Sequence, residues 1–263
     1  MLWFFVALVG AFGLIIGSFL NVVIWRVPRG RSVVRPASAC PACGAAIRAY
    51  DNVPIVSWLV LRGRCRDCHA AISVRYPAVE ALTSVAFVLV ALRFLGEPAE
   101  AWATPAYLYL AAIAVALALI DIDTHRLPDS IILPSIGVML VLLAVASAAT
   151  GDWSRFGRAL IGATVLFGTY FAMLVAYPAG MGFGDVKLAA VLGLSLAWLG
   201  WGPLAVGAFA AFVLGGVFSL LLVATGKANR KTAVPFGPWM LLGAASGIGA
   251  GTSLWAAYLG LLS

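Results

Sequence analysis

The sequence predicts an all-α, polytopic membrane protein that crosses the bilayer about eight times. Two features of its composition predict this class: 63% of its 263 residues are hydrophobic and only 10% are charged. A soluble domain is about half apolar and about a quarter charged. In addition, the apolar residues fall into runs close to the roughly 20 residues that a transmembrane helix needs. The composition excludes both a single-core soluble domain and a disordered chain.

The expected spans divide the chain into three parts. The first span, residues 1–25, has no basic segment before it and no small-residue cleavage site, so a retained helix is favoured over a signal peptide. A polar, Arg-rich loop domain follows at 26–76. The remainder, 77–263, is a seven-helix membrane domain. Its spans are predicted at about 77–95, 102–120, 130–150, 157–177, 186–200, 203–225 and 235–262.

The distribution of basic residues sets the expected orientation. Nine of the 17 Lys and Arg residues lie in 26–75, and cytoplasmic loops are enriched in these residues. With that loop in the cytoplasm, 14 basic residues fall on the cytoplasmic side and three on the outer side. Lys227, Arg230 and Lys231 contribute to the larger group. Membrane topology therefore accounts for the net charge of +7, and we expect membrane lipid rather than nucleic acid as a partner.

Three acids follow the third predicted span. Asp121 directly continues its apolar run, so we expect Asp121 to lie deeper than Asp123. Pro128 breaks the helix, and Asp129 is then expected to cap the next one. All three fall on the cytoplasmic side of the predicted topology.

A fourth acid, Asp185, follows three glycines within 180–184, which permit close approach of another backbone. A helix N-cap is the alternative role for this residue. If Asp185 meets Asp121, the two carboxylates cannot both ionise cheaply and share a proton. One can then activate water while the other protonates a scissile carbonyl.

The residues alone leave other functions open beside such an aspartyl protease. A transporter with a carboxylate proton relay would place acids near the bilayer midplane, often in repeated segments. Here the acids lie at span ends and the sequence contains no evident repeat. A non-enzymatic, metal-anchored assembly factor is the third possibility. The two His residues lack a matched nucleophile, so a Ser–His or Cys–His site is not expected.

The loop domain carries two Cys-x-x-Cys pairs separated by 21 residues: Cys40, Cys43, Cys65 and Cys68. This spacing is close to that of four-cysteine, ribbon-type zinc sites. Two disulfides or inert thiols are the alternatives, and a cytoplasmic location disfavours disulfides. Four thiolates close the coordination shell, so the zinc is expected to be structural and to stabilise a loop with little core.

The order and spacing of these features closely resemble the bacterial prepilin peptidases over nearly the whole chain. The matching segments are 17–26, the two Cys pairs with Asn52, Pro54, 57–58 and 62–64 between them, 75–77 with Glu80, 121–129, and 182–187.

The resemblance implies a GxGD-type aspartyl protease whose catalytic pair is Asp121 and Asp185. The family's first aspartate lies seven residues before the Pro of a Pro–Asp pair, which Asp121 satisfies with Pro128. Asp123 is the competitor for this role. The residues expected to support the pair are Gly182, Gly184, Lys187, Asp123 and Asp129.

The implied substrates are type IV prepilins or type II secretion pseudopilins. Their basic leader would be cut after a Gly at the cytoplasmic face of the bacterial inner membrane. Many relatives also methylate the new N-terminal amine with S-adenosylmethionine, and the four-cysteine loop is associated with that bifunctional form. The candidate cofactor-binding residues are Asp51, Asn52, Arg62 and Glu80. Many relatives have Glu where this chain has Asp51. The shorter side chain is expected to affect methylation and to leave cleavage unchanged.

Overall fold

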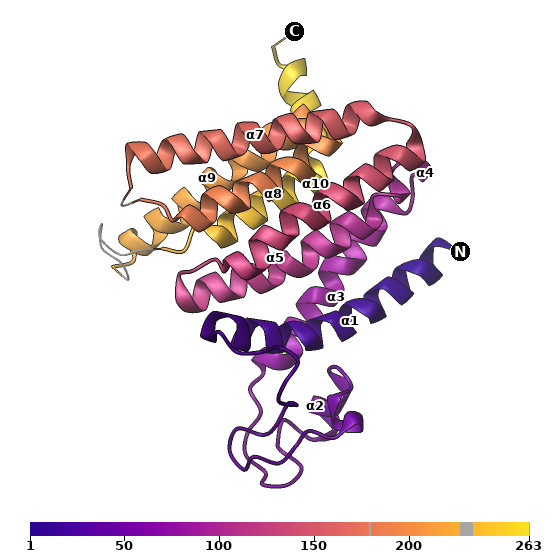
Figure 1. Ribbon diagram of the computed structural model, residues 1–263, viewed down its shortest axis with the longest axis vertical. Helices are drawn as coiled ribbons and strands as arrows, with labels where there is room; N and C mark the ends of the chain where they lie inside the picture. The colour runs from indigo at the N-terminus through magenta and orange to yellow at the C-terminus, as the bar shows by residue number, and fades with distance from the viewer. Residues whose placement is uncertain (179, 227–233, 263) are drawn as a thin grey trace. The chain divides into compact units, whose positions relative to one another are not determined.

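The structure is a computed structural model that describes residues 1–178, 180–226 and 234–262. Within these ranges it is helical, with two isolated β-bridges and no strand, so the predicted fold class is confirmed (Figure 1). The connector with Lys227, Arg230 and Lys231 lies outside the described residues. The long helices are α1 (Leu2–Arg26), α3 (Arg75–Phe94), α5 (Thr104–Thr124), α6 (Asp129–Thr150), α7 (Trp153–Ala176), α9 (Trp201–Ala224) and α10 (Gly237–Gly260).

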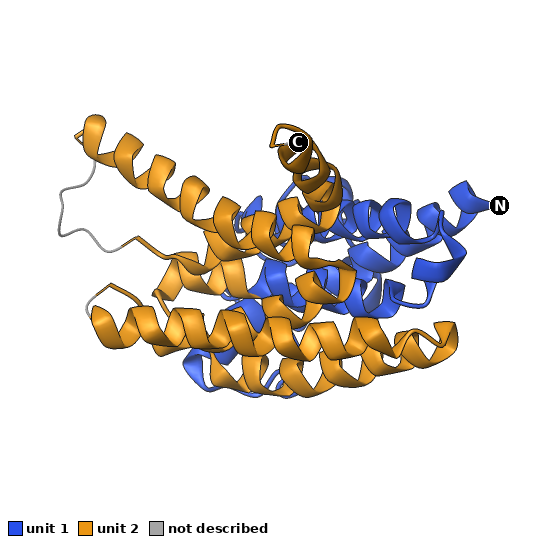
Figure 2. Cartoon of the chain, turned by 90° about the horizontal axis from the view of Figure 1, so that it is seen from above, with its two compact units in different colours: residues 1–116 blue, residues 117–263 orange. Residues whose placement is uncertain are grey.

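These seven helices are long and apolar enough to cross a membrane. The remaining predicted span is α8 (Phe183–Leu199), which has 17 residues. The short elements of the described chain are η1 (Val27–Arg29), η2 (Ala49–Asn52), α2 (Val56–Val60) and α4 (Pro98–Ala101). The chain forms two compact units, residues 1–116 and 117–263, and the boundary falls inside α5 (Figure 2).

In the first unit, α1 packs closely against α3 through a stripe of small residues. Gly10, Gly13 and Gly17 share one face of α1, and a Cβ at Gly17 would lie 2.6 Å from the Cα of Glu80. The Ser84 hydroxyl donates a hydrogen bond to the carbonyl of Gly10 at 2.8 Å. Small residues let the backbones of membrane helices approach closely. The packing contacts that result hold the two helices together, because in lipid there is no hydrophobic effect to do so.

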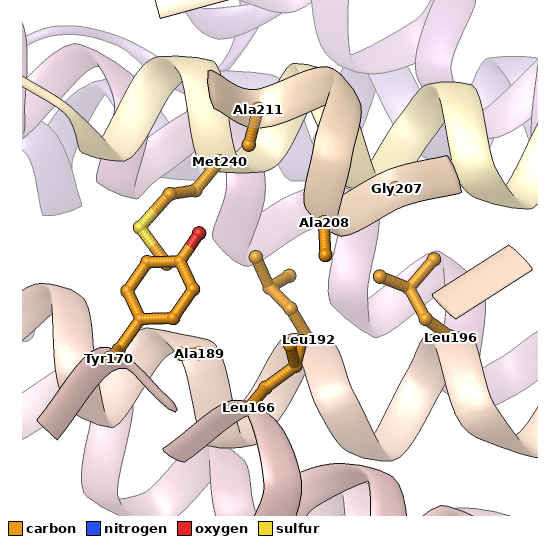
Figure 3. Close-up of a pocket in the computed structure, with 9 residues that line it drawn as sticks. All are labelled: Leu166, Tyr170, Ala189, Leu192, Leu196, Gly207, Ala208, Ala211 and Met240. Carbon is orange, nitrogen blue, oxygen red and sulfur yellow. The ribbon is translucent and has the colours of Figure 1, made fainter. Parts of the chain in front are cut away.

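In the second unit, α8 is the central helix and contacts α6, α7, α9 and α10. After Lys187 it is apolar on nearly every face, as expected of a helix covered on all sides, and it is buried over most of its length. Gly193 allows α7 to come close, since a Cβ there would lie 2.5 Å from the carbonyl oxygen of Gly162. Figure 3 shows a small pocket of about 10 Å³ that is lined by residues of α7, α8, α9 and α10.

The C-terminal end of α8 is held by an arginine from α7. The Arg158 guanidinium donates hydrogen bonds to the carbonyls of Ala197 and Trp198 at 2.6 and 2.7 Å. The indole of Trp198 donates in turn to the Ser147 hydroxyl at 3.0 Å. These bonds satisfy carbonyls that a helix end leaves without intrahelical partners. The position of α8 is therefore fixed at the end opposite to Asp185.

Candidate active site and metal centre

Asp121 lies in the last turn of α5, within the second unit, and is only 5% exposed. Its Oδ2 accepts a hydrogen bond from the backbone N–H of Gly237 at 3.0 Å. Gly237 is the first residue of α10, where the N–H groups have no partner within the helix. A Cβ at this position would lie 2.7 Å from Asp121 Oδ2, so any other residue here would displace the carboxylate.

Asp185 lies in the first turn of α8 and is 8% exposed. Its Oδ2 accepts a hydrogen bond from the backbone N–H of Gly182 at 3.0 Å. Gly182, rather than Asp185, is the N-cap residue of α8, with extended backbone angles. Asp185 therefore reaches back from inside the helix to bind the N-terminus, where the helix dipole favours negative charge.

The two buried aspartates belong to one cluster of helix ends. Leu127, in the connector after α5, touches the starts of both α8 and α10. A Cβ at Gly184 would lie 2.8 Å from the Cβ of Leu127, and one at Gly237 would lie 3.3 Å from its Cδ2. Asp121 lies close enough for its charge to act on the Asp185 carboxyl. The structure thus brings together two carboxylates that are 64 residues apart in the sequence.

The other predicted acids have different positions. Asp123 is exposed, in contrast to the buried Asp121. The capping role predicted for Asp129 is wrong, because Pro128 is the N-cap of α6. Both carboxylate oxygens of Asp129 instead accept hydrogen bonds from the Lys187 ammonium at 2.7 Å. This ion pair joins the first turn of α6 to the second turn of α8.

Sequence reasoning named Asp129 and Lys187 as supporting residues but did not foresee their ion pair, and it missed Gly237. The Asp129–Lys187 pair links residues 58 positions apart, and Gly237 binds an aspartate 116 positions away. No local spacing connects residues at such distances. The prolines beside Gly237 were a signal of a helix start, but they gave no indication of which side chain would meet it.

The four cysteines of the first unit form a group suited to a metal ion. Their sulfur atoms all lie within 4.8 Å of one another, and all four thiols are free. The sulfurs of Cys40 and Cys68 are 3.8 Å apart. A tetrahedral zinc with Zn–S bonds of about 2.3 Å would place its sulfurs about 3.8 Å apart. The group therefore fits four-thiolate coordination.

Both Cys pairs adopt the same local fold, which explains why the sulfurs converge. In each, the N–H four residues after the first cysteine donates to that cysteine's carbonyl: Gly44 to Cys40, and His69 to Cys65. Gly44 and His69 have positive φ angles of 75° and 59°. Each turn is closed by an isolated antiparallel bridge. Two such turns supply two thiolates each.

The four candidate cofactor residues make different contacts. Asp51 accepts hydrogen bonds from Nε and Nη2 of Arg66, the latter at 2.6 Å. The Arg66 guanidinium holds the pKa of the Asp51 carboxyl below its usual range. Arg62 lies in a turn with a φ of 52°. Glu80 is 7% exposed and accepts the backbone N–H of Ile55 at 2.7 Å.

Asn52 is the one of these four that lines a sizeable pocket. The pocket has a volume of about 600 Å³ and is bordered by α1 and by two stretches of the following loop. It belongs entirely to the first unit.

Comparisons with known proteins identify both halves of the chain. Residues 11–94 match the bacterial peptidase A24 N-terminal domain, and residues 108–220 match the type IV leader peptidase family. The chain is 37% identical to a prepilin leader peptidase/N-methyltransferase of Aeromonas salmonicida, over 91% of this chain and 89% of that protein. It is 38% identical to one of Neisseria gonorrhoeae, over 85% of each. No solved structure matches the chain.

Proposed function

Because the chain belongs to the type IV leader peptidase family, we propose that Asp121 and Asp185 are the catalytic pair with which it removes the leader from type IV prepilins or type II secretion pseudopilins. As a member of this family it is a membrane protease that also has methyltransferase activity. The observation that carries the assignment of the pair is the burial of both carboxylates at adjoining helix ends, each bound by one backbone N–H.

The pair acts by dividing the work of an acid and a base. Gly182 and Gly237 each fix one oxygen of a carboxylate through a backbone N–H, which leaves the second oxygen for the reacting groups. The ionised carboxylate takes a proton from water as the water oxygen bonds to the scissile carbonyl carbon, and the protonated carboxyl group donates to the carbonyl oxygen. The tetrahedral intermediate then collapses: its C–N bond breaks, the leaving amine takes up a proton from the carboxyl group that received one from water, and the other carboxylate regains its proton from a hydroxyl of the intermediate. The Asp129–Lys187 ion pair holds α8 and α6 in register beside the pair.

The proposed setting is the bacterial inner membrane with the aspartates facing the cytoplasm. The excess of basic residues in 26–75 supports this orientation. The leader of the substrate is basic and remains cytoplasmic, so its cleavage requires acids on that side. A proton-relay transporter finds no support in the family, and the acids lie at helix ends rather than along a path through the bilayer.

We assign different tasks to the parts of the chain. The membrane domain, 77–263, carries out the cleavage. The loop domain, 26–76, is held by a structural zinc ion on Cys40, Cys43, Cys65 and Cys68. The methyl donor for the new N-terminal amine is S-adenosylmethionine.

Incubation of the purified enzyme with a prepilin and S-adenosylmethionine tests both activities at once. The intact mass of the product is expected to show loss of the leader and gain of one methyl group. Loss of the leader alone would remove methylation from the proposal. It would point to Asp51, which stands where many relatives have Glu, as the cause of the missing methylation. An uncleaved substrate in the presence of folded enzyme would contradict the proposed function.

Gly184→Ala is expected to lower the cleavage rate by about tenfold to 10²-fold. The added Cβ would lie 2.8 Å from the Cβ of Leu127, so the start of α8 must shift, and displacements near 1 Å at a catalytic group can cost about 10²-fold. The matched control is Gly168→Ala on α7, because a Cβ at Gly168 meets nothing within 4 Å. Equal rates for the two variants would show that this close approach does not position Asp185.

A further inference from the structure

A strained turn lies in the loop of the first unit, between the two Cys pairs. Ile55 has φ 60° and ψ −50°, and the N–H of Val56 donates to the carbonyl of Pro54 at 2.5 Å. These values describe a γ-turn with positive φ at its centre, which is rare and strained. A β-branched residue is especially unfavourable in this conformation. The sequence alone gives no reason for such a turn.

Side chains hold the turn from two sides. The buried carboxylate of Glu80 on α3 accepts the N–H of Ile55 at 2.7 Å. The Ser57 hydroxyl accepts the N–H of Val53 and donates to the carbonyl of Tyr50, both at 3.0 Å. Strained backbone persists only where its surroundings over-determine it, and it gathers at functional sites. We therefore expect the turn to hold part of a functional site in place.

What the turn fixes is one wall of the pocket that Asn52 lines. Asn52, Val53 and Pro54, the residues immediately before Ile55, form this wall. One face of α1, including Phe19 and Val22, forms another, and Arg26 at the end of α1 supplies a positive charge. A volume of about 600 Å³ lies within the range of about 300–1,000 Å³ that is typical of small-molecule sites.

We propose that this pocket is the binding site for S-adenosylmethionine, an inference that rests on the methyltransferase activity in the proposed function. The apolar walls suit the adenine ring and the methylene chain of the donor. The Arg26 guanidinium suits the carboxylate of the donor. The Asn52 amide can donate hydrogen bonds to the polar edge of the adenine ring and accept them from it. The lining residues thus suit the adenine ring and the carboxylate of the donor.

When bound, S-adenosylmethionine supplies an electrophilic methyl group: the amine nitrogen bonds to the methyl carbon, the C–S bond breaks with its electron pair left on sulfur, and the amine proton leaves to water. The residues of this chain contribute binding and position. Arg26 is already oriented, since its Nη1 donates to the carbonyl of Ser32 at 3.0 Å. Glu80 is a positioning residue, because it acts on the pocket wall through the backbone of Ile55.

The test is direct binding of S-adenosylhomocysteine, the demethylated product, to the purified full-length enzyme by calorimetry. Arg26→Gln, which removes the charge, and Ala37→Trp, which fills the pocket from the loop side, are each expected to weaken binding by tenfold or more. Arg35→Gln is the matched control, since it removes one charge from the same loop outside the pocket lining. A bound metal content equal to that of the wild type verifies that each variant loop is folded.

The outcomes separate the location of the site from the proposed function. Wild-type affinity in both pocket variants would overturn the location and leave methylation standing. A wild-type enzyme that binds neither S-adenosylhomocysteine nor S-adenosylmethionine would remove the methyltransferase activity itself. Ultraviolet crosslinking of radiolabelled donor, followed by peptide mapping, provides a second measurement. Label in 15–38 or 52–54 is expected, and label confined to other segments would contradict the assignment.

Glu80 has its own diagnostic pair of variants. Glu80→Gln retains an oxygen that can accept the N–H of Ile55, whereas Glu80→Ala does not. We therefore expect Glu80→Ala to weaken S-adenosylhomocysteine binding by about tenfold and Glu80→Gln to retain it. Equal loss in both would mean that the carboxylate charge, rather than the position of the turn, matters for binding.

Discussion

Asp185→Asn is expected to reduce leader cleavage by about 10³-fold or more while the protein still folds and inserts into the membrane. Proton transfer by a positioned side chain contributes about 10²–10⁴-fold to such a reaction. The asparagine oxygen can still accept the N–H of Gly182, which Asp185 now binds at 3.0 Å, so the start of α8 keeps its structure. What is lost is the ability to take up and release a proton.

Asp121→Asn is expected to have the same effect, because neither member of a proton-sharing pair works alone. Cleavage is measured from the mass of the product, and folding from the thermal unfolding of the detergent-solubilised enzyme. Asp152→Asn is the matched control, since the Asp152 side chain is partly exposed and its bonds within the described part of the chain are to Ser154 and Arg155 beside it. A larger loss in Asp123→Asn than in Asp121→Asn would move the first catalytic role to Asp123.

Cys65→Ser is expected to abolish zinc binding and to unfold the loop between α1 and α3. Cys65 is the buried member of the four-cysteine group. The ion pairs of this loop are partly exposed. In small zinc domains the metal contributes about 10–16 kcal/mol of binding free energy that is also folding free energy. Loss of one thiolate therefore removes the main restraint on this segment.

Metal analysis and limited proteolysis measure this outcome. The wild type is expected to hold one zinc ion per chain, and the variant to be cut rapidly within 27–74. Treating the wild type with a chelator should reproduce the same cleavage pattern, and added zinc should reverse it. A wild type that contains no zinc, or a variant as resistant to protease as the wild type, would contradict a structural metal.

The sequence was sufficient for the fold class and for the group of four cysteines, because both depend on local patterns. Apolar runs of bilayer length and two Cys-x-x-Cys pairs retain their meaning in any tertiary arrangement. The depth of Asp121 relative to Asp123 was also predictable, because Asp121 continues an apolar run.

Other parts of the site depend on which helix ends meet. Asp129 was predicted to cap its own helix, yet Lys187 lies close enough to bind both of its oxygens. The carboxylate of Asp129 binds a charged partner on another helix instead of the N-terminus of its own helix. Nothing near Ile55 in the sequence predicts its positive φ, because the stabilising carboxylate comes from α3, 25 residues away.

The shortness of α8 makes bilayer thickness part of the environment of this enzyme. Its 17 residues give a length of about 25 Å, whereas the hydrocarbon core is about 30 Å thick. The helices that cover α8 have 22–24 residues, so the lipid meets these longer helices and α8 is expected to end below the headgroups. Since Arg158 holds the other end of α8, we expect this shortfall at the Asp185 end. A thinner bilayer would bring that end nearer to water, and cleavage should accordingly be faster in lipids with short acyl chains than in lipids with long ones.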